Sequence, residues 1–234
     1  MFYLIFAEAA LETIPREIWN HPAVKLLAKK THKKPGKLIL DSSYLYQAMK
    51  ELEDFNKRGR PDIIHFCLLY ALGSELNLDN MLRIFVHTVN DQIIRVNPSV
   101  RLPRNYPRFI GLMEQLFEKK VIADSKGEQL LSIYDMKISD LISELKPDSV
   151  ILLQEGKPML PRNLIIENIR NKKKLAFIVG AFPHGCYRQE ISKISPAAYS
   201  ISKYTLDTWN AIGKLISICE DIIADIKGEQ TPST

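Results

Sequence analysis

Short runs of apolar residues alternate along this chain with longer segments in which apolar positions recur at the spacing of helical turns. The short runs predict buried strands, and the longer segments predict helices with one buried face. Strands are expected at Phe2–Ala7, Lys37–Asp41, Leu82–Thr88, Gln92–Val96, Gln129–Tyr134, Val150–Leu153, Leu175–Val179 and Ala198–Ser202. Helices are expected at Arg16–Lys29, with an interruption at Pro22, and at Tyr44–Leu52, Ile63–Leu72, Arg108–Lys119, Ile138–Leu145, Asn163–Asn171 and Thr205–Lys227. The tail Glu229–Thr234 is expected to be disordered.

This alternation predicts an α/β fold in which a mostly parallel sheet carries helices on both faces. The strands at 82–88 and 92–96 flank Asn90 and Asp91, which is typical of a β-hairpin. The sequence contains no internal repeat and no low-complexity linker. We therefore expect a single domain over residues 1–234, with the hairpin and the segment after it as a nucleic-acid-binding insertion at about residues 80–109.

The segment after the hairpin, Arg95–Phe109, carries four arginines and three prolines without an acidic residue. Proline fixes its own backbone angle and favours extended geometry before it, so this segment is expected to form a stiff arm. Arg101, Arg104 and Arg108 follow a spacing that points side chains the same way if the arm runs into a helix. A planar guanidinium suits phosphate oxygens and base edges, which predicts nucleic-acid binding. A solvated basic loop with structural ion pairs explains the composition equally well.

The overall charge is only mildly basic, with a formal net charge of +5 and a pI near 9.0. The excess is concentrated in His21–Lys37, Lys57–Arg60 and Lys172–Lys174, and phosphate binding requires such local patches. The first and last patches are equally compatible with solubilising lysines. Three widely spaced cysteines favour a reducing cytosol and argue against structural zinc. With no apolar run of about 20 residues and no basic leader before the first strand, we expect a soluble, intracellular protein without a membrane partner.

Candidate ligand-binding loops follow three strands in the last third of the chain. In open α/β sheets, ligands bind where the chain leaves the carboxyl ends of strands. Gly156, the pair Gly180 and Gly185, and the segment Ile201–Leu206 occupy such positions. Glycine there lets backbone groups approach a ligand closely. Neither GxGxxG nor a P-loop is present, so Rossmann and phosphate-cradle sites are excluded.

Other candidate side chains have structural alternatives. His184 has a side chain that titrates near neutral pH, but a single histidine in a loop is more often structural. Asp62 is suited to orienting Arg60, to acting as a base, or to capping the helix that follows, as Ser42 or Ser43 is expected to cap the helix at 44–52. Tyrosines 44, 46 and 106 suit stacking on a base or simple packing. No GxSxG, HExxH or paired-carboxylate motif occurs, so hydrolase chemistry has no support.

Six stretches occur in an order that resembles one family: AEAALETIP, LILDSSYLYQAMK, RGRPDIIHF, IRVNPSVRLPRNYPRFIGLMEQLF, VGAFPHG and YSISKYTL. Together they resemble the Emg/Nep ribosome-biogenesis family, small-subunit rRNA pseudouridine N(1)-methyltransferases of the SPOUT class. The resemblance runs from about Phe2 to Ile223. It implies an S-adenosylmethionine-dependent enzyme without a metal, with a trefoil-knotted C-terminal α/β fold, that works as a homodimer on small-subunit ribosomal RNA. Ribosomal proteins are further candidate partners. The absence of an N-terminal extension resembles archaeal members, so a cytoplasmic archaeal protein is expected.

The resemblance also implies roles for individual residues. The RNA-contacting arginines of the family match Arg60, Arg101, Arg104 and Arg108, and the acid that holds the first of these matches Asp62. The cofactor-binding positions match Gly156, Gly180, Gly185, Ile201, Ser202, Lys203, Tyr204, Thr205 and Leu206. Two departures from the family pattern, Cys186 after PHG and the TLDTW start of the last helix, lie beside the cofactor loops and leave the class unchanged.

The resulting hypothesis is that N1 of a flipped-out pseudouridine displaces the sulfonium methyl group while arginines hold the flanking RNA. Arg60, ordered by Asp62, is the expected catalytic group that stabilises charge as the N–H is lost. Direct base catalysis by Asp62 is less favoured, because an acid paired with arginine is a poorer base. Two alternatives stay open: a non-catalytic rRNA-binding assembly factor, and methyl transfer to uridine or cytidine.

Overall fold

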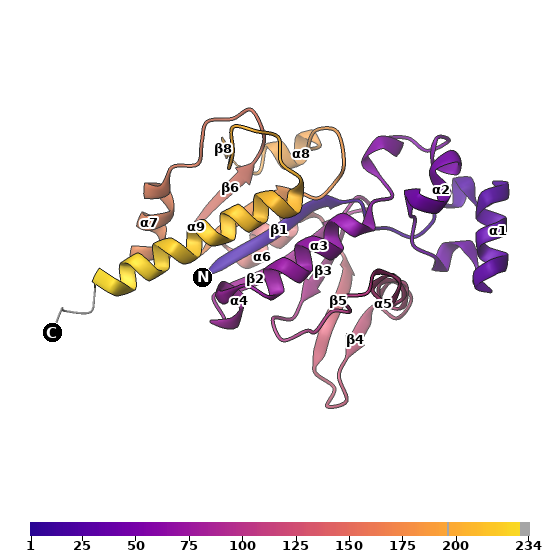
Figure 1. The fold of residues 1–234 in the computed structure, drawn as a ribbon, viewed down its shortest axis with the longest axis horizontal. Helices are drawn as coiled ribbons and strands as arrows, with labels where there is room; N and C mark the ends of the chain where they lie inside the picture. The colour runs from indigo at the N-terminus through magenta and orange to yellow at the C-terminus, as the bar shows by residue number, and fades with distance from the viewer. Residues whose placement is uncertain (196, 230–234) are drawn as a thin grey trace.

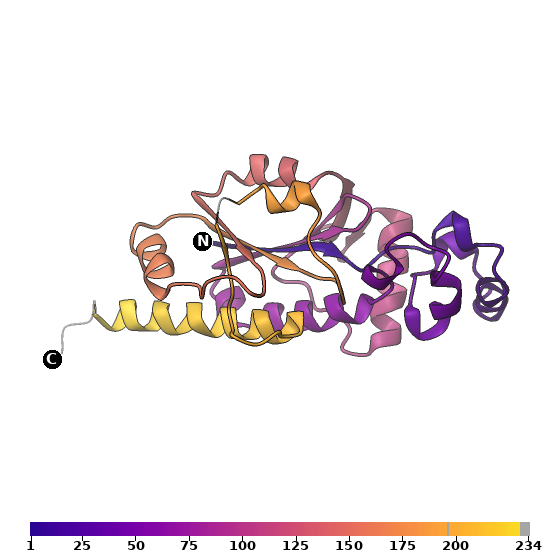
Figure 2. The ribbon, with the colours of Figure 1, turned by 90° about the horizontal axis from the view of Figure 1, so that it is seen from above.

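The computed structural model describes residues 1–195 and 197–229, which form an eight-stranded sheet between two layers of helices (Figures 1 and 2). The strands are β1 (Phe2–Ala9), β2 (Leu82–Thr88), β3 (Gln92–Val96), β4 (Val121–Ala123), β5 (Gln129–Asp135), β6 (Ser149–Leu153), β7 (Leu175–Gly180) and β8 (Ala198–Tyr199). Their spatial order is β4-β5-β3-β2-β1-β7-β6-β8. The five strands from β2 to β8 run parallel, and β3, β5 and β4 extend the other edge in antiparallel pairs. The predicted α/β class with a mostly parallel sheet is confirmed.

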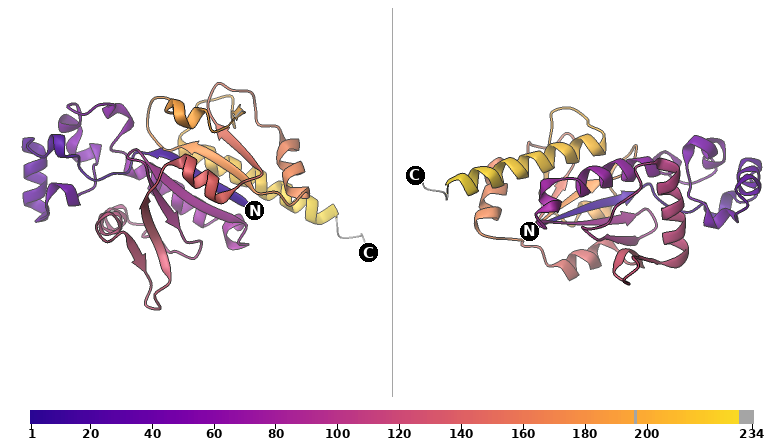
Figure 3. Two further views of the ribbon diagram at one scale, coloured as in Figure 1. Left: turned by 180° about the vertical axis from the view of Figure 1, so that it is seen from behind. Right: turned by 60° about the horizontal axis from the view of Figure 1, so that its bottom comes forward.

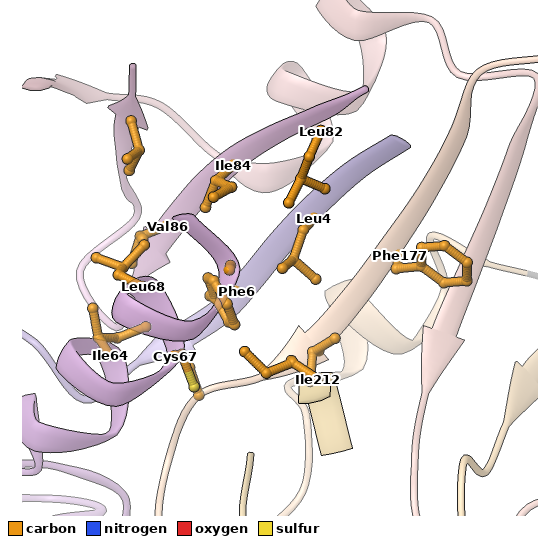
Figure 4. Close-up of a cluster of buried hydrophobic side chains, with 14 of the residues drawn as sticks. Leu4, Phe6, Ile64, Cys67, Leu68, Leu82, Ile84, Val86, Phe177 and Ile212 are labelled. Atoms are coloured by element: carbon orange, nitrogen blue, oxygen red, sulfur yellow. The ribbon is translucent and has the colours of Figure 1, made fainter. Parts of the chain in front are cut away.

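The central strand β1 shows why the sheet is covered twice. Its side chains alternate between two cores: Phe2, Leu4 and Phe6 belong to one, and Tyr3, Ile5 and Ala7 to the other. The first core is closed by α3 (Pro61–Leu72), α4 (Glu75–Leu78), α5 (Tyr106–Lys119), α7 (Arg162–Arg170) and α9 (Thr208–Glu229), and Figure 4 shows part of it. The second core is closed by α6 (Ile138–Leu145) and α8 (Gln189–Ser192). A strand buried on both faces needs apolar residues at every position, which explains the continuous apolar start of the chain.

Residues 14–57 form a small lobe at the carboxyl end of β1 (Figure 3). It contains η1 (Arg16–Ile18), α1 (Pro22–Thr31), η2 (Pro35–Lys37), α2 (Ser42–Met49) and η3 (Phe55–Lys57). The lobe has its own core, formed by Ile14, Ile18, Val24, Leu38, Leu40, Leu45, Ala48, Met49 and Leu52. Ion pairs from Lys33 to Glu114 and from Lys37 to Glu118 join it to α5. Part of the lysine-rich patch is therefore structural.

Several predicted elements differ from the structure for local reasons. The segment 37–41 is not a strand, because it makes only a short pairing with residues 12–14, while Leu38 and Leu40 pack into the core of the lobe and Ile39 into the first core of the sheet. Pro22 does interrupt the first helix, since it opens α1 at the first helical position. The last helix begins at Thr208, because the preceding residues turn around the pocket described below. Short elements such as β4, α4 and α8 carry too few residues to show a period.

The caps of two helices were also predicted wrongly. Asp41 caps α2 by accepting a hydrogen bond from the backbone N–H of Ser43 at 2.8 Å, so neither serine has that role. Arg60 occupies the N-cap position of α3, and Asp62 lies in the first turn. Asp62 is consequently available to pair with Arg60.

Two further observations concern the ends and the length of the elements. Glu229 is the last residue of α9, whereas the rest of the tail for which disorder was predicted lies outside the described residues. In the described part of the chain, no helix combines the length and apolar character needed to cross a membrane.

Candidate active site

A pocket of about 300 Å³ lies at the carboxyl ends of β6, β7 and β8. Its walls come from three loops, residues 153–155, 179–187 and 200–206, together with Thr208 and Ala211 at the start of α9. These loops leave neighbouring strands of one sheet, which places them side by side although they are far apart in the sequence. The position is the one at which open α/β sheets bind ligands.

Hydrogen bonds between side chains and backbone tie these loops together. The Thr205 hydroxyl donates to Glu155 Oε2 at 2.6 Å, and the Thr208 hydroxyl donates to the carbonyl of Gly180 at 2.9 Å. The Tyr187 hydroxyl donates to the carbonyl of Leu153 at 2.7 Å, and burial raises the pKa of this phenol above its usual range. Two of these bonds join different loops and the third joins α9 to the second loop, so the pocket has a defined shape before anything enters it.

Most of the predicted cofactor residues line this pocket, namely Gly180, Gly185, Ile201, Ser202, Tyr204, Thr205 and Leu206. Gly156 and Lys203, which were also predicted, are not among the lining residues. Gly156 makes the turn after the first loop with φ of +71°, and the Lys203 ammonium lies 4.9 Å from the centre of the Tyr204 ring. Gly185 has φ of +105°, and a Cβ there would meet no atom within 4 Å. It therefore borders open space in a conformation that other residues rarely adopt.

His184 also lines the pocket, but its geometry does not favour a catalytic role. The side chain is exposed, and none of the described residues forms a hydrogen bond with its imidazole. No neighbouring group among the described residues therefore fixes the orientation or the tautomer of this ring. Phe182 and Tyr187, which sequence reasoning did not single out, supply the aromatic walls of the pocket and contact each other edge to face.

Arg60 and Asp62 form a two-pronged ion pair beside this pocket. Nε and Nη2 of the guanidinium donate to the two carboxylate oxygens at 2.8 and 2.7 Å. These hydrogen bonds raise the pKa of Arg60, and the carboxylate of Asp207, directly after the third loop, raises it further. Both oxygens of Asp62 accept from one guanidinium, which holds that group in one orientation.

The backbone of Ala10 connects the arginine to the pocket. The N–H of Ala10 donates to the carbonyl of Ala181 at 2.9 Å, and the carbonyl of Ala10 accepts from the N–H of Arg60 at 3.2 Å. Ala181 opens the second loop of the pocket. The predicted substrate arginine and the predicted cofactor loops of the chain therefore lie at the same edge of the fold.

The arm is more structured than its prolines alone suggested. Of its arginines, only Arg108 is helical, because α5 begins at Tyr106; the argument from helical spacing therefore does not apply to Arg101 and Arg104. All three side chains are exposed, and their guanidinium groups make no ion pair within residues 1–195 and 197–229. Arg95 differs, since it pairs with Glu144 at 2.6 Å.

Residues from α3 and α4 hold the arm in place. His65, which is 2% exposed, donates from Nε2 to the carbonyl of Pro103 at 2.7 Å and stacks on Phe109 at 4.3 Å between ring centres. Asn77 donates from its amide to the carbonyl of Pro98 at 2.9 Å. The Tyr106 hydroxyl donates to Asp41 at 2.6 Å, and burial together with this bond raises the pKa of the phenol above its usual range. Sequence reasoning named Tyr106 as a stacking or packing residue but missed His65 and Asn77, because single buried polar residues leave no periodic signal.

The basic run Lys57–Arg60 is not the free patch that its composition suggested. The Arg58 guanidinium is bound through two hydrogen bonds of 2.7 Å to the fully buried carboxylate of Glu12. Lys57 pairs with Glu8 at 3.0 Å. Of the three basic side chains in this run, that of Arg60 is paired with Asp62 instead of with Glu8 or Glu12, and it is more than one-third exposed.

The chain is similar in sequence and in fold to known proteins. The sequence profile of the EMG1/NEP1 methyltransferase family matches residues 4–220. The chain is 46% identical to the ribosomal RNA small subunit methyltransferase Nep1 of Pyrococcus furiosus, over 92% of this chain and 94% of that protein. It is 45% identical to the protein of the same name from Staphylothermus marinus, over 91% and 92% of the two chains. The crystal structure of Archaeoglobus fulgidus Nep1 bound to S-adenosylhomocysteine superposes with a TM-score of 0.85 at 35% identity, covering 95% of this chain and 98% of that chain.

Proposed function

The chain belongs to the EMG1/NEP1 methyltransferase family, and we propose that it methylates N1 of a pseudouridine in small-subunit ribosomal RNA. Its membership, the names of its relatives and the S-adenosylhomocysteine in its structural neighbour make it an S-adenosylmethionine-dependent methyltransferase of that RNA, with a role in small-subunit biogenesis. The observation that carries the proposal is the position of Ala10, whose backbone bonds to the cofactor loop on one side and to Arg60 on the other.

The pocket suits the cofactor in size and in chemistry. Aromatic and aliphatic walls from Phe182, Ile201 and Leu206 suit an adenine ring, and loop backbone supplies donors and acceptors for its edge. The open space at Gly185 leaves room for a ligand against the main chain. Gly156 and Lys203 lie outside the lining residues, so we assign them to shaping the loops rather than to direct contact. The bound cofactor supplies an electrophilic methyl group on a sulfonium centre.

The exposed arginines of the arm are assigned to the RNA. Arg101, Arg104 and Arg108 have no carboxylate partner within the described residues, so their guanidinium groups are available to phosphates. Their backbone is held by His65 and Asn77, which lowers the entropy lost when RNA binds. A target nucleoside flipped out of its stack would then lie between the arm and the pocket.

Arg60 is assigned the catalytic role, with Asp62 as its positioning partner. In pseudouridine the ring is joined to ribose through carbon, so N1 carries a proton and is free to attack. The bond from N1 to the methyl carbon forms as the carbon–sulfur bond breaks, and the N1 proton leaves to solvent. A guanidinium beside the ring stabilises the negative charge that develops as this proton is lost. Asp62 is a poor candidate for the base, since both its oxygens accept from Arg60.

The path of the chain around β8 supports the trefoil knot implied by the resemblance. β8 pairs with β6, while Ser200 bonds to Pro158 and Leu160 on the other side through its backbone N–H and carbonyl. Residues 198–200 therefore pass between the two ends of the loop that follows β6. A chain threaded through that loop would have this arrangement.

We further propose a homodimer in the cytoplasm of an archaeon, the domain from which its relatives come. Phe66 and Tyr70 on the outer face of α3 are 51% and 46% exposed, and Phe66 contacts Trp209 of α9. An aromatic patch of this kind is typical of an interface.

The proposal is tested by incubating the protein with S-adenosylmethionine labelled in its methyl group and two RNA loops that differ only by uridine or pseudouridine at one position. Label is expected in the pseudouridine loop alone, and the Gly185→Val variant is expected to transfer none while still binding the RNA. Equal labelling of the uridine loop would refute the pseudouridine assignment. RNA binding without any labelling by the wild type would favour the non-catalytic assembly factor.

A further inference from the structure

The run Lys57–Arg60 sends its three basic side chains to three different places. Arg58 binds the buried Glu12 at the base of the lobe, and Arg60 binds Asp62 on the substrate side. Gly59, with φ of +66°, makes the turn between them. Lys57 points instead toward the second loop of the pocket, and its side chain is only 14% exposed. The function proposed above gives Lys57 no role.

The ammonium of Lys57 contacts this loop at both of its ends. It donates to the carbonyl of Cys186 at 2.6 Å and lies 4.3 Å from the centre of the Phe182 ring. Within the described residues, the backbone of residues 182–186 makes no hydrogen bond other than this one from Lys57 to Cys186. Gly185, within the same stretch, has a backbone conformation that other residues rarely adopt. The conformation of the loop thus depends on a residue outside it.

The ammonium is itself held by a buried carboxylate. Glu8, at the end of β1, is 2% exposed and accepts from Lys57 at 3.0 Å and from Nε and the backbone N–H of Arg188 at 2.6 and 3.0 Å. Its φ of +50° is unusual for a residue with a side chain and indicates a conformation maintained by its surroundings. Arg188 in turn binds Asp91 at 2.9 Å. Because Arg188 immediately follows Tyr187, Glu8 anchors the far end of the loop as well.

We propose that Lys57 is a positioning residue for the cofactor, whose ammonium holds residues 182–186 in the conformation that binds S-adenosylmethionine. This inference rests on the proposed function, since it assigns the pocket to that cofactor. Lys57 belongs to the lobe and lies three residues before Arg60. The lobe therefore takes part in building the cofactor pocket, in addition to carrying residues on the substrate side.

The test compares Lys57→Met with a matched control, Lys50→Met. Lys50 is another lysine of the lobe region whose ammonium lies over an aromatic ring, 5.2 Å from the centre of Tyr46, but it is not among the residues lining the pocket. Binding of S-adenosylhomocysteine is measured by titration calorimetry, binding of the RNA loop by filter retention, and folding by thermal unfolding. Loss of a charged donor predicts a rise of about tenfold or more in the Kd for S-adenosylhomocysteine in Lys57→Met. The KM for the cofactor should rise with it, while RNA affinity and the Lys50→Met variant stay at wild-type values.

Lys57→Arg keeps a charged donor, so it should recover most of the affinity. Hydrogen exchange of the peptide covering residues 181–188, measured without ligand, gives a second readout and should be faster in Lys57→Met than in the wild type. A lower melting temperature with unchanged Kd and unchanged exchange would assign Lys57 a merely structural role and overturn the proposal. If the wild type itself fails to bind S-adenosylhomocysteine, it is the proposed function that fails.

Discussion

Because His65 anchors the arm, a substitution there tests how much the orientation of the arm contributes to RNA binding while its number of positive charges stays the same. In the His65→Phe variant the ring that stacks on Phe109 is kept, but the hydrogen bond of 2.7 Å to the carbonyl of Pro103 is lost. One neutral hydrogen bond contributes about 1 kcal/mol, and Pro103 is only partly buried, so water can replace the donor. For a chain of 234 residues this loss corresponds to a fall in melting temperature of about 2–4 °C.

The same loss sets an upper bound on the effect on RNA binding. If the arm is less often in its binding conformation, the apparent affinity falls by the same factor, and about 1 kcal/mol corresponds to about fivefold. The number of arginines is unchanged, so the slope of log affinity against log salt concentration should not change. Filter binding over a series of salt concentrations measures both quantities. We expect a weakening of about three- to fivefold with parallel salt lines for His65→Phe and the wild type. A changed slope, or an unchanged affinity in a variant with the expected melting temperature, would refute the view that His65 orients the arm.

Four other predictions address the remaining parts of the site. Arg104→Ala should weaken RNA binding and reduce the steepness of the salt line by about 0.7, the value for one phosphate contact on a single strand, with S-adenosylhomocysteine affinity unchanged in calorimetry. In Gly185→Ala the added Cβ has no neighbour within 4 Å, but the backbone at φ of +105° is strained for any residue with a side chain. The free energy of unfolding, measured by chemical denaturation, should therefore fall by about 1–2 kcal/mol. Gly185→Val should in addition lose cofactor binding. Burial lowers the pKa of His87, whose Nδ1 accepts from the N–H of Glu8 and whose Nε2 donates to Asp91. The unfolded chain therefore binds more protons than the folded chain below about pH 6.5, so the free energy of unfolding should fall by up to about 2 kcal/mol on acidification toward pH 5. A His87→Gln variant should lack this fall. Cys186 is exposed and lines the pocket, whereas Cys67 and Cys219 are buried and burial raises the pKa of both thiols. Mass spectrometry should therefore find Cys186 alkylated first, and S-adenosylhomocysteine should protect it. Equal modification of all three cysteines would contradict the described burial.

The sequence alone predicted the elements with a clear apolar period and the loops that follow buried strands, because both depend on local sequence. The alternation of apolar runs predicted β1, β7 and the helices that cover them, because a strand buried on both faces and a helix with one buried face have distinct patterns. The glycine-containing loop after β7 and the segment before α9 were expected to bind a ligand, and both line one pocket. The sequence also showed arginines without nearby acids at Arg101, Arg104 and Arg108, although it left open whether they are exposed or held in ion pairs.

Which charges were free to bind a ligand was decided only by the tertiary structure. Lys57 and Arg58 look like part of a basic patch with Arg60, yet their partners lie about 50 residues earlier, Glu8 at the end of β1 and Glu12 just after it. No local pattern connects residues so distant, since burying a carboxylate requires a cation that the fold brings to it. For the same reason the sequence could not reveal that His65 holds the arm, or that a single backbone position, Ala10, bonds to both the substrate arginine and the cofactor loop.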